Sequence, residues 1–141
     1  MSLRAIPLIA VAFILYNVIV LLGGSAPPAE VLARRIFEVP MLHSDPNIKW
    51  VFTWGDFLIL IVFVLLFIEL LKSTYTSTAS LLDHGLSMVL FVVCLIEFLL
   101  AKQAATSVFF FITMATMIDV VAGYTIGIRV ARRDLSIGSD A

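Results

Sequence analysis

The sequence predicts an all-α membrane protein, a bundle of four transmembrane helices with a short amphipathic helix in its first connection. Hydrophobic residues make up 62% of the 141 residues and charged residues only 13%, against about 45–50% and about 25% in soluble domains. The apolar residues gather in four long segments, and one connection between these segments is long. The whole chain, 1–141, is therefore expected to form a single integral membrane domain.

Each apolar segment is close to the roughly 20 residues that a helix needs to cross a hydrocarbon core about 30 Å thick. The expected spans are 5–22, 51–71, 81–101 and 107–131. The first segment could instead be a signal peptide that is cleaved after Ala26. Its apolar stretch exceeds the about 7–15 residues that are usual in signal peptides, so we favour a retained helix.

The basic residues near the span ends indicate the orientation. One side would carry Arg4, Lys72, Arg129, Arg132 and Arg133, and the other would carry Arg34, Arg35, Lys49 and Lys102. The first group is slightly larger and includes a dense cluster near the C-terminus. We therefore expect both termini to lie in the cytoplasm.

The long connection, 23–50, contains the expected amphipathic helix. Pro27-Pro28 can start a helix, because the N–H that proline lacks has no partner in the first turn anyway. Leu32, Ile36 and Val39 then recur at helical spacing. This helix could lie in the membrane interface and cap one mouth of the bundle. We favour the simpler interpretation, a folded linker without a ligand, because surface helices are commonly amphipathic.

Polar and small residues in the last two spans fall on one face of each predicted helix. In the third span the face carries Asp83, Ser87, Cys94 and Glu97, and in the fourth it carries Thr116, Asp119, Gly123 and Gly127. Gly123 and Gly127 form a GxxxG motif, which lets two helices approach closely. We expect both faces to point to the bundle interior or to a partner chain, with Ser87, Thr116 and the two glycines as helix-packing residues.

Asp119 is the most informative single residue, because it lies near the middle of the fourth span. A carboxylate at that depth is costly and needs a partner or a proton. The expected partners are His84, Thr116, Tyr124 and Asn17. The functional interpretation is a proton or cation site, and the alternative is a hydrogen-bonded carboxyl that fixes helix packing. We favour the alternative, because no second carboxylate or base is expected at the same depth.

Other ionisable residues in the spans are further candidates for ion binding, namely His84, Glu97 and Asp56. Together with Asp119 they could form a ladder of proton carriers across the membrane. A simpler interpretation is two ion-pair clusters near the span ends, Glu69 with Lys72 or Arg129, and Glu97 with Lys102. We favour the ion pairs, because residues near span ends can reach water.

Several chemistries find no support in the sequence. The net charge of −1 provides no basic excess for nucleic-acid binding. Cys94 is the single cysteine, and His43 and His84 are the two histidines, on opposite sides of the predicted membrane. A thiolate metal site or a bis-histidine haem is therefore not expected. Hydrolase and nucleotide-binding motifs do not occur either, so we expect no catalytic residue, metal or cofactor.

The sequence resembles a group of small bacterial inner-membrane proteins with four predicted helices. The resemblance lies in the C-terminal stretch from Asp119 to Asp134, in Trp54-Gly55-Asp56 at the start of one span and in Asp83-His84 at the start of the next. It covers most of the chain and implies a multi-pass protein of the bacterial inner (plasma) membrane. No activity and no functional residue is implied by it.

From the sequence we expect a non-catalytic accessory or interaction subunit of a membrane complex, in contact with lipid and with other subunits or copies of itself. The Gly123/Gly127 face would make such contacts. The alternative function is a small oligomeric transporter or channel for protons or cations that uses Asp119. An enzyme of lipid or quinone chemistry is less well supported.

Overall fold

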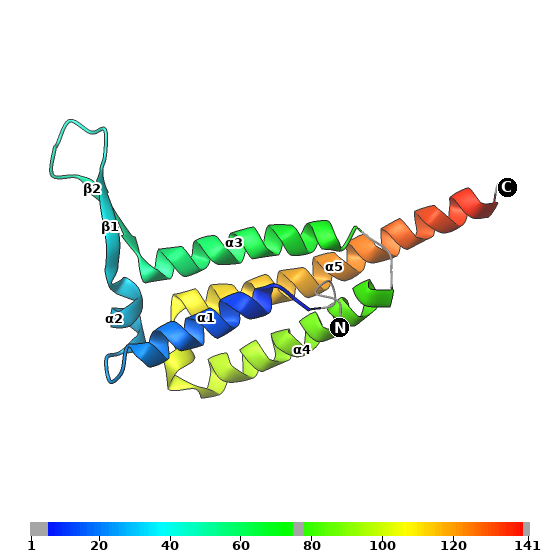
Figure 1. Ribbon diagram of the computed structural model, residues 1–141, viewed down its shortest axis with the longest axis horizontal. Coiled ribbons are helices and arrows are strands. Elements are labelled where there is room, and N and C mark those ends of the chain that lie inside the picture. Colours follow the sequence, from blue (N-terminus) through cyan, green and yellow to red (C-terminus); the bar gives the residue numbers. More distant parts are fainter. Residues whose placement is uncertain (1–5, 75–77, 140–141) are drawn as a thin grey trace.

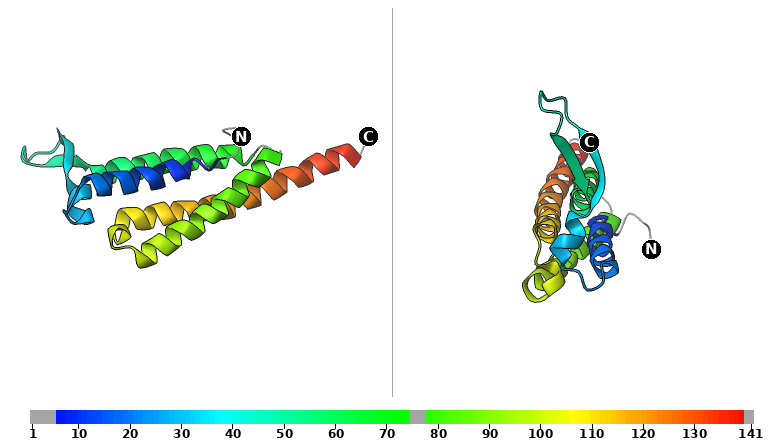
Figure 2. Two further views of the ribbon diagram at one scale, coloured as in Figure 1. Left: turned by 60° about the horizontal axis from the view of Figure 1, so that its bottom comes forward. Right: turned by 90° about the vertical axis from the view of Figure 1, so that its left-hand side faces the viewer.

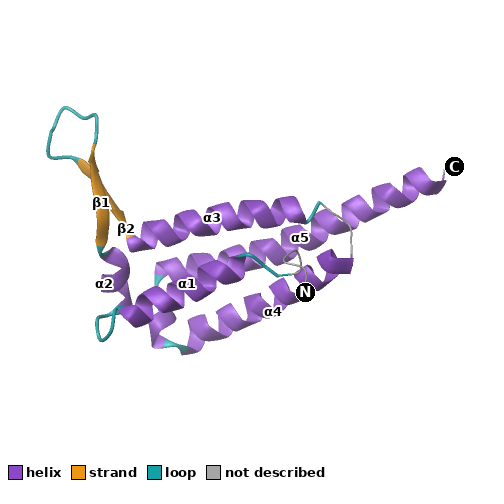
Figure 3. Ribbon diagram, viewed as in Figure 1, coloured by secondary structure: helices purple, strands orange, loops and turns teal. Residues whose placement is uncertain are grey.

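The computed structural model describes residues 6–74 and 78–139 (Figure 1). This part of the chain is mostly helical, with one small sheet near one end of the helices (Figure 3). In chain order its elements are α1 (Ile9–Leu22), α2 (Pro28–Ala33), β1 (Arg35–Pro40), β2 (Lys49–Thr53), α3 (Trp54–Lys72), α4 (Thr78–Leu100), the 3-10 helix η2 (Lys102–Ala104) and α5 (Ser107–Ser139).

Three of these helices, α3, α4 and α5, are long and apolar enough to cross a membrane. The first expected span is shorter than predicted, because α1 has 14 residues and a length of about 21 Å. That length falls short of a hydrocarbon core of about 30 Å. The prediction of four full spans is therefore replaced by three candidate spans and one shorter apolar helix. Arg4 and the turn residues 75–77 lie outside the described residues.

The helices form one bundle in which α5 lies against α4, α3 and α1, while α1 also packs on α3 (Figure 2). The core is apolar in the half near the sheet. Its centre is the Tyr16 ring, which meets the Phe109 ring edge to face at 4.9 Å between centroids. Further buried residues of this core are Ile9, Ala12, Val20, Leu58, Val62, Cys94, Ile112 and Ala115.

The connection after α1 differs from the sequence prediction. The helix begins at Pro28 as expected but ends at Ala33, after 6 residues. The chain then turns into β1, which pairs antiparallel with β2. The β-branched and aromatic residues of the two strands suit a hairpin, whose backbone groups find partners across the ladder. Ile36 and Val39, predicted to lie on a helix, are strand residues, so the expected amphipathic helix is mostly a β-hairpin.

Two polar caps fix how the chain enters its helices. The Thr53 Oγ1 accepts from the Asp56 backbone N–H, and the Asp56 carboxylate accepts from the Thr53 N–H at 2.9 Å. This capping box satisfies N–H groups that have no partner in the first turn. The Thr106 Oγ1 caps α5 by accepting from the Phe109 N–H at 3.2 Å. After α1 the chain turns at Gly24, whose φ of 68° suits glycine.

We expect Tyr16→Phe to lower the free energy of unfolding by about 0.5–1.5 kcal/mol, because it removes the hydrogen bonds of a fully buried side chain. The Tyr16 hydroxyl donates to the Gln103 carbonyl at 2.6 Å and lies 2.7 Å from the Thr106 Oγ1. These contacts tie α1 to the connection between α4 and α5. Thermal unfolding in mild detergent measures the effect. Tyr124→Phe, at a partly exposed position, is the matched control, and equal stability of both variants would contradict the prediction.

Candidate functional site

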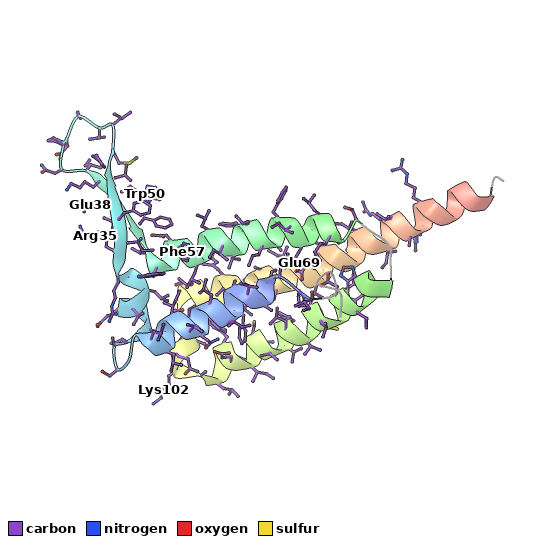
Figure 4. The ribbon with its side chains drawn as sticks, viewed as in Figure 1. Arg35, Glu38, Trp50, Phe57, Glu69 and Lys102 are labelled. Carbon is purple, nitrogen blue, oxygen red and sulfur yellow. The ribbon has the colours of Figure 1, made fainter. Side chains whose placement is uncertain are left out.

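Buried polar side chains gather in the half of the bundle that lies away from the sheet. They come from the end of α3, the start of α4 and the middle of α5. The members that concern the site are Glu69, Lys72, Asp83, His84, Ser87 and Asp119, which we call the charged cluster. Five of them are buried, with 1–7% of their surface exposed, and Lys72 is 20% exposed. Figure 4 labels Glu69 toward the end of α3 that lies away from the hairpin.

Lys72 is the cation of the charged cluster. Its Nζ lies 3.0 Å from Glu69 Oε2 and 3.1 Å from Asp83 Oδ1, so it joins α3 to α4. It also donates to the Ile6 carbonyl at 3.1 Å. The Glu69 carboxylate in turn accepts from the backbone N–H of Leu8. The predicted pair of Glu69 with Lys72 is present, but the Glu69 side chain is inside the bundle and does not reach water.

Asp119 belongs to the same cluster. The polar groups placed around its carboxylate are the Ser87 hydroxyl and the side chains of Asp83, His84 and Lys72. From the sequence we expected no second carboxylate or base at the depth of Asp119, and this stays a prediction. The structure does place further buried ionisable side chains, those of Glu69, Asp83 and His84, in the charged cluster with it.

Three of the expected partners of Asp119 are engaged elsewhere. Thr116 lies one turn before Asp119 on the same face and donates to the Thr113 carbonyl at 2.7 Å. Asn17 donates to the Phe13 carbonyl within α1, at 3.2 Å. The Tyr124 ring lies against the His84 ring, with 5.2 Å between centroids. Of the four partners predicted, His84 is the one that acts on Asp119 directly.

His84 occupies the glycine face of α5. A Cβ added at Gly123 would lie 2.8 Å from His84 Cε1, and one at Gly127 would lie 3.5 Å from Nε2. The GxxxG motif thus accepts a histidine ring of the same chain. His84 Nε2 and the Ser87 Oγ are buried and have no well-formed hydrogen bond. Both unpaired atoms belong to residues that act on the Asp119 carboxylate.

The other candidates lie toward the opposite end of the bundle. Asp56 is held in the capping box of α3. Glu97 lines a groove of about 700 Å³ between α1 and the end of α4, together with Asn17 and Lys102. The Oε1 atom of Glu97 is buried without a hydrogen-bond partner. The predicted ion pair with Lys102 therefore does not provide this atom with a hydrogen bond.

Cys94 on α4 and Thr116 on α5 are buried between the two ends of the bundle, where these two helices pack together. Thr116 is one helical turn from Asp119. The two polar faces predicted from the sequence therefore lie against each other within one chain. Within the described residues, no three His, Cys, Asp or Glu side chains are placed to hold a metal ion.

Comparisons of this chain with known protein families, with curated proteins and with solved structures find no match. The geometry of the charged cluster and of the exposed surfaces is therefore the basis for assigning a function.

Proposed function

We propose that this chain is a small membrane transporter or channel for protons or a small cation, and that Asp119 is its ion-binding carboxylate. The observation that carries the proposal is the composition of the charged cluster. The cluster holds three carboxylates and one ammonium group, and that ammonium, on Lys72, pairs with Glu69 and Asp83. Buried charge without compensation is costly in a low dielectric. Such a cluster favours the uptake of a proton or a cation.

The placement of the neighbouring groups supports the same function. Lys72 already pairs with Glu69 and Asp83. Asp119 is therefore the carboxylate of the charged cluster whose negative charge is balanced least by a neighbouring positive charge. The unpaired Nε2 of His84 is a group that can pass on a proton. The faces of α4 and α5 that pack together also carry the buried Cys94 and Thr116. Polar groups inside membrane helices commonly mark such a pathway.

Reconstitution into liposomes loaded with a dye that reports pH, Na⁺ or K⁺ tests the proposal. We expect an imposed pH gradient, or a gradient of Na⁺ or K⁺, to drive a flux through the parent protein. Asp119→Asn keeps the size of the side chain and removes its charge, so the flux should be lost while the melting temperature stays close to that of the parent. Asp45→Asn, in the exposed loop between the strands, is the matched control and should conduct normally.

Two results would contradict the ion-binding function. One is the absence of any flux through a folded parent protein under all three gradients. The other is an Asp119→Asn variant that conducts as well as the parent. Comparison of the three gradients identifies the ion that is carried.

A second candidate is the accessory or interaction subunit of a membrane complex, and the length of α5 supports it. This helix has 33 residues, or about 50 Å, and its C-terminal end runs past the other helices (Figure 1). Arg129 and Arg132 are exposed on that end, where they could contact an acidic partner. Purification in mild detergent tests this function, because a larger partner at fixed stoichiometry favours it and a pure homo-oligomer favours the transporter.

A further inference from the structure

The β-hairpin has two chemically different faces. Phe37 pairs with Phe52, and Val39 pairs with Trp50. Residues that pair across antiparallel strands share one side of the sheet, and side chains alternate along each strand. These four residues therefore form one face, which we call the aromatic face. Its rings are in contact, with centroids 4.7 Å apart for Phe37 and Phe52 and 5.5 Å apart for Trp50 and Phe52.

The opposite face carries the charges of the hairpin. Glu38 lies 2.6 Å from the Arg35 guanidinium and 2.8 Å from the Lys49 ammonium. The hydrogen bonds from Lys49 and Arg35 hold the pKa of Glu38 below its usual range, so its carboxylate stays charged at neutral pH. Val51 pairs with Glu38 and lies on this charged face.

The hairpin lies across the bundle axis, at the end where α3 begins, and reaches beyond the helices (Figures 1 and 2). Seen along the bundle from that end, the sheet is face-on, so one face is turned toward the bundle end and the other away from it. Figure 4 shows Trp50 on the side toward the bundle, and Arg35 and Glu38 on the side away from it. With α3, α4 and α5 upright in a bilayer, the aromatic face is therefore turned toward the lipid.

Much of the aromatic face is uncovered by the described chain. Trp50 is 51% exposed and Phe37 is 46% exposed. A two-stranded hairpin with such a surface is marginally stable in water on its own. The strand that carries Trp50 leads directly into α3, because Thr53 ends β2 and Trp54, which is 38% exposed, begins α3. The capping box at this junction holds the hairpin at its angle to the helix.

We propose that the hairpin lies flat on the bilayer surface, with its aromatic face in the headgroup layer and its charged face in water. Aromatic side chains favour that layer, where the rings contact apolar groups and the indole N–H stays hydrated. The occupant of the aromatic face is thus phospholipid. This inference rests on the three long helices spanning a bilayer and is independent of any ion transport.

Tryptophan quenching in the full-length protein tests the proposal. The chain has two tryptophans, so Trp54→Phe leaves Trp50 as the single reporter. The matched control is Val51→Trp together with Trp50→Phe and Trp54→Phe, which moves the reporter by one residue to the charged face. Both proteins are reconstituted in phosphatidylcholine and phosphatidylglycerol vesicles. Lipids brominated high in their acyl chains report contact with the membrane, and iodide reports contact with water.

We expect Trp50 to be quenched several-fold more by the brominated lipids than the reporter at position 51, and several-fold less by iodide. Strong iodide quenching at both positions would place the hairpin in water and overturn the proposal. Protection from iodide without quenching by brominated lipids would also overturn it, because a second copy of the chain would then cover the aromatic face.

Discussion

Lys72→Met is expected to lower the free energy of unfolding by about 3–5 kcal/mol, the usual cost of removing one partner of a buried ion pair. The Lys72 ammonium is the cation that Glu69 and Asp83 share. Methionine keeps most of the apolar stem of the lysine side chain. It leaves Glu69 and Asp83, which are 1% and 4% exposed, without the positive charge that balances them. The contact of Lys72 with the Ile6 carbonyl is lost as well, so α1 should detach more easily from the end of α3.

The measurement is thermal or denaturant unfolding in mild detergent. Lys49→Met is the matched control, because it removes a lysine from an ion pair at the exposed hairpin, where such pairs contribute little. Adding Glu69→Gln and Asp83→Asn to Lys72→Met should restore most of the lost stability, since the uncompensated charges are then gone. A Lys72→Met protein as stable as the parent would show that the charged cluster is not held by its cation.

The long helices could be predicted closely because their signal is local. The range 51–71 became α3, Trp54–Lys72, and the range 81–101 became α4, Thr78–Leu100. A run of apolar residues indicates such a helix without knowledge of its neighbours. The C-terminal limit of α5 was less predictable. The helix continues from the expected end at 131 to Ser139, because nothing in the polar sequence after Arg129 stops a helix that has already formed.

The hairpin could not be predicted from periodicity alone. Leu32, Ile36 and Val39 fit a helix, yet a short apolar segment also fits a strand. This segment is a strand and not a helix because of a partner that is distant in the sequence. That partner is the strand Lys49–Thr53, which gives β1 its hydrogen bonds. The β-branched and aromatic residues on both sides of the loop, with Pro40 and Pro46 near it, are the signal that could have indicated a hairpin.

The charged cluster was predictable only in part. Spacing along a single helix placed Ser87 and Asp119 on two polar faces, and the structure places both in the contact between α4 and α5. The depth of Glu69 and Lys72 depends on how far each helix is shifted along the bundle, which a count of residues does not provide. One signal was available for Glu69. It lies eleven residues after Leu58 and seven after Val62, on the buried face of α3.

The alanine substitution Gly123→Ala should destabilise the protein by about 1–3 kcal/mol, the usual cost of overpacking a tight contact. The added Cβ would lie 2.8 Å from Cε1 and 2.9 Å from Nδ1 of His84. The His84 ring is 7% exposed and lies against the Tyr124 ring, so it has little room to move away. The added methyl group therefore forces α4 and α5 apart or turns the imidazole away from Asp119.

Gly127→Ala is the matched control, because its Cβ would lie 3.5 Å from His84 Nε2, an ordinary contact distance. Alanine is also the better helix former by about 1 kcal/mol, so this variant should be as stable as the parent or slightly more stable. His84→Ala should remove most of the difference between the two glycine variants, which a double-mutant cycle measures. Size-exclusion chromatography in the same detergent shows whether the glycine face makes a contact within one chain or between chains. If Gly123→Ala changed the oligomeric state and left the melting temperature unaltered, the glycine face would be a contact between chains and His84 would not be its partner.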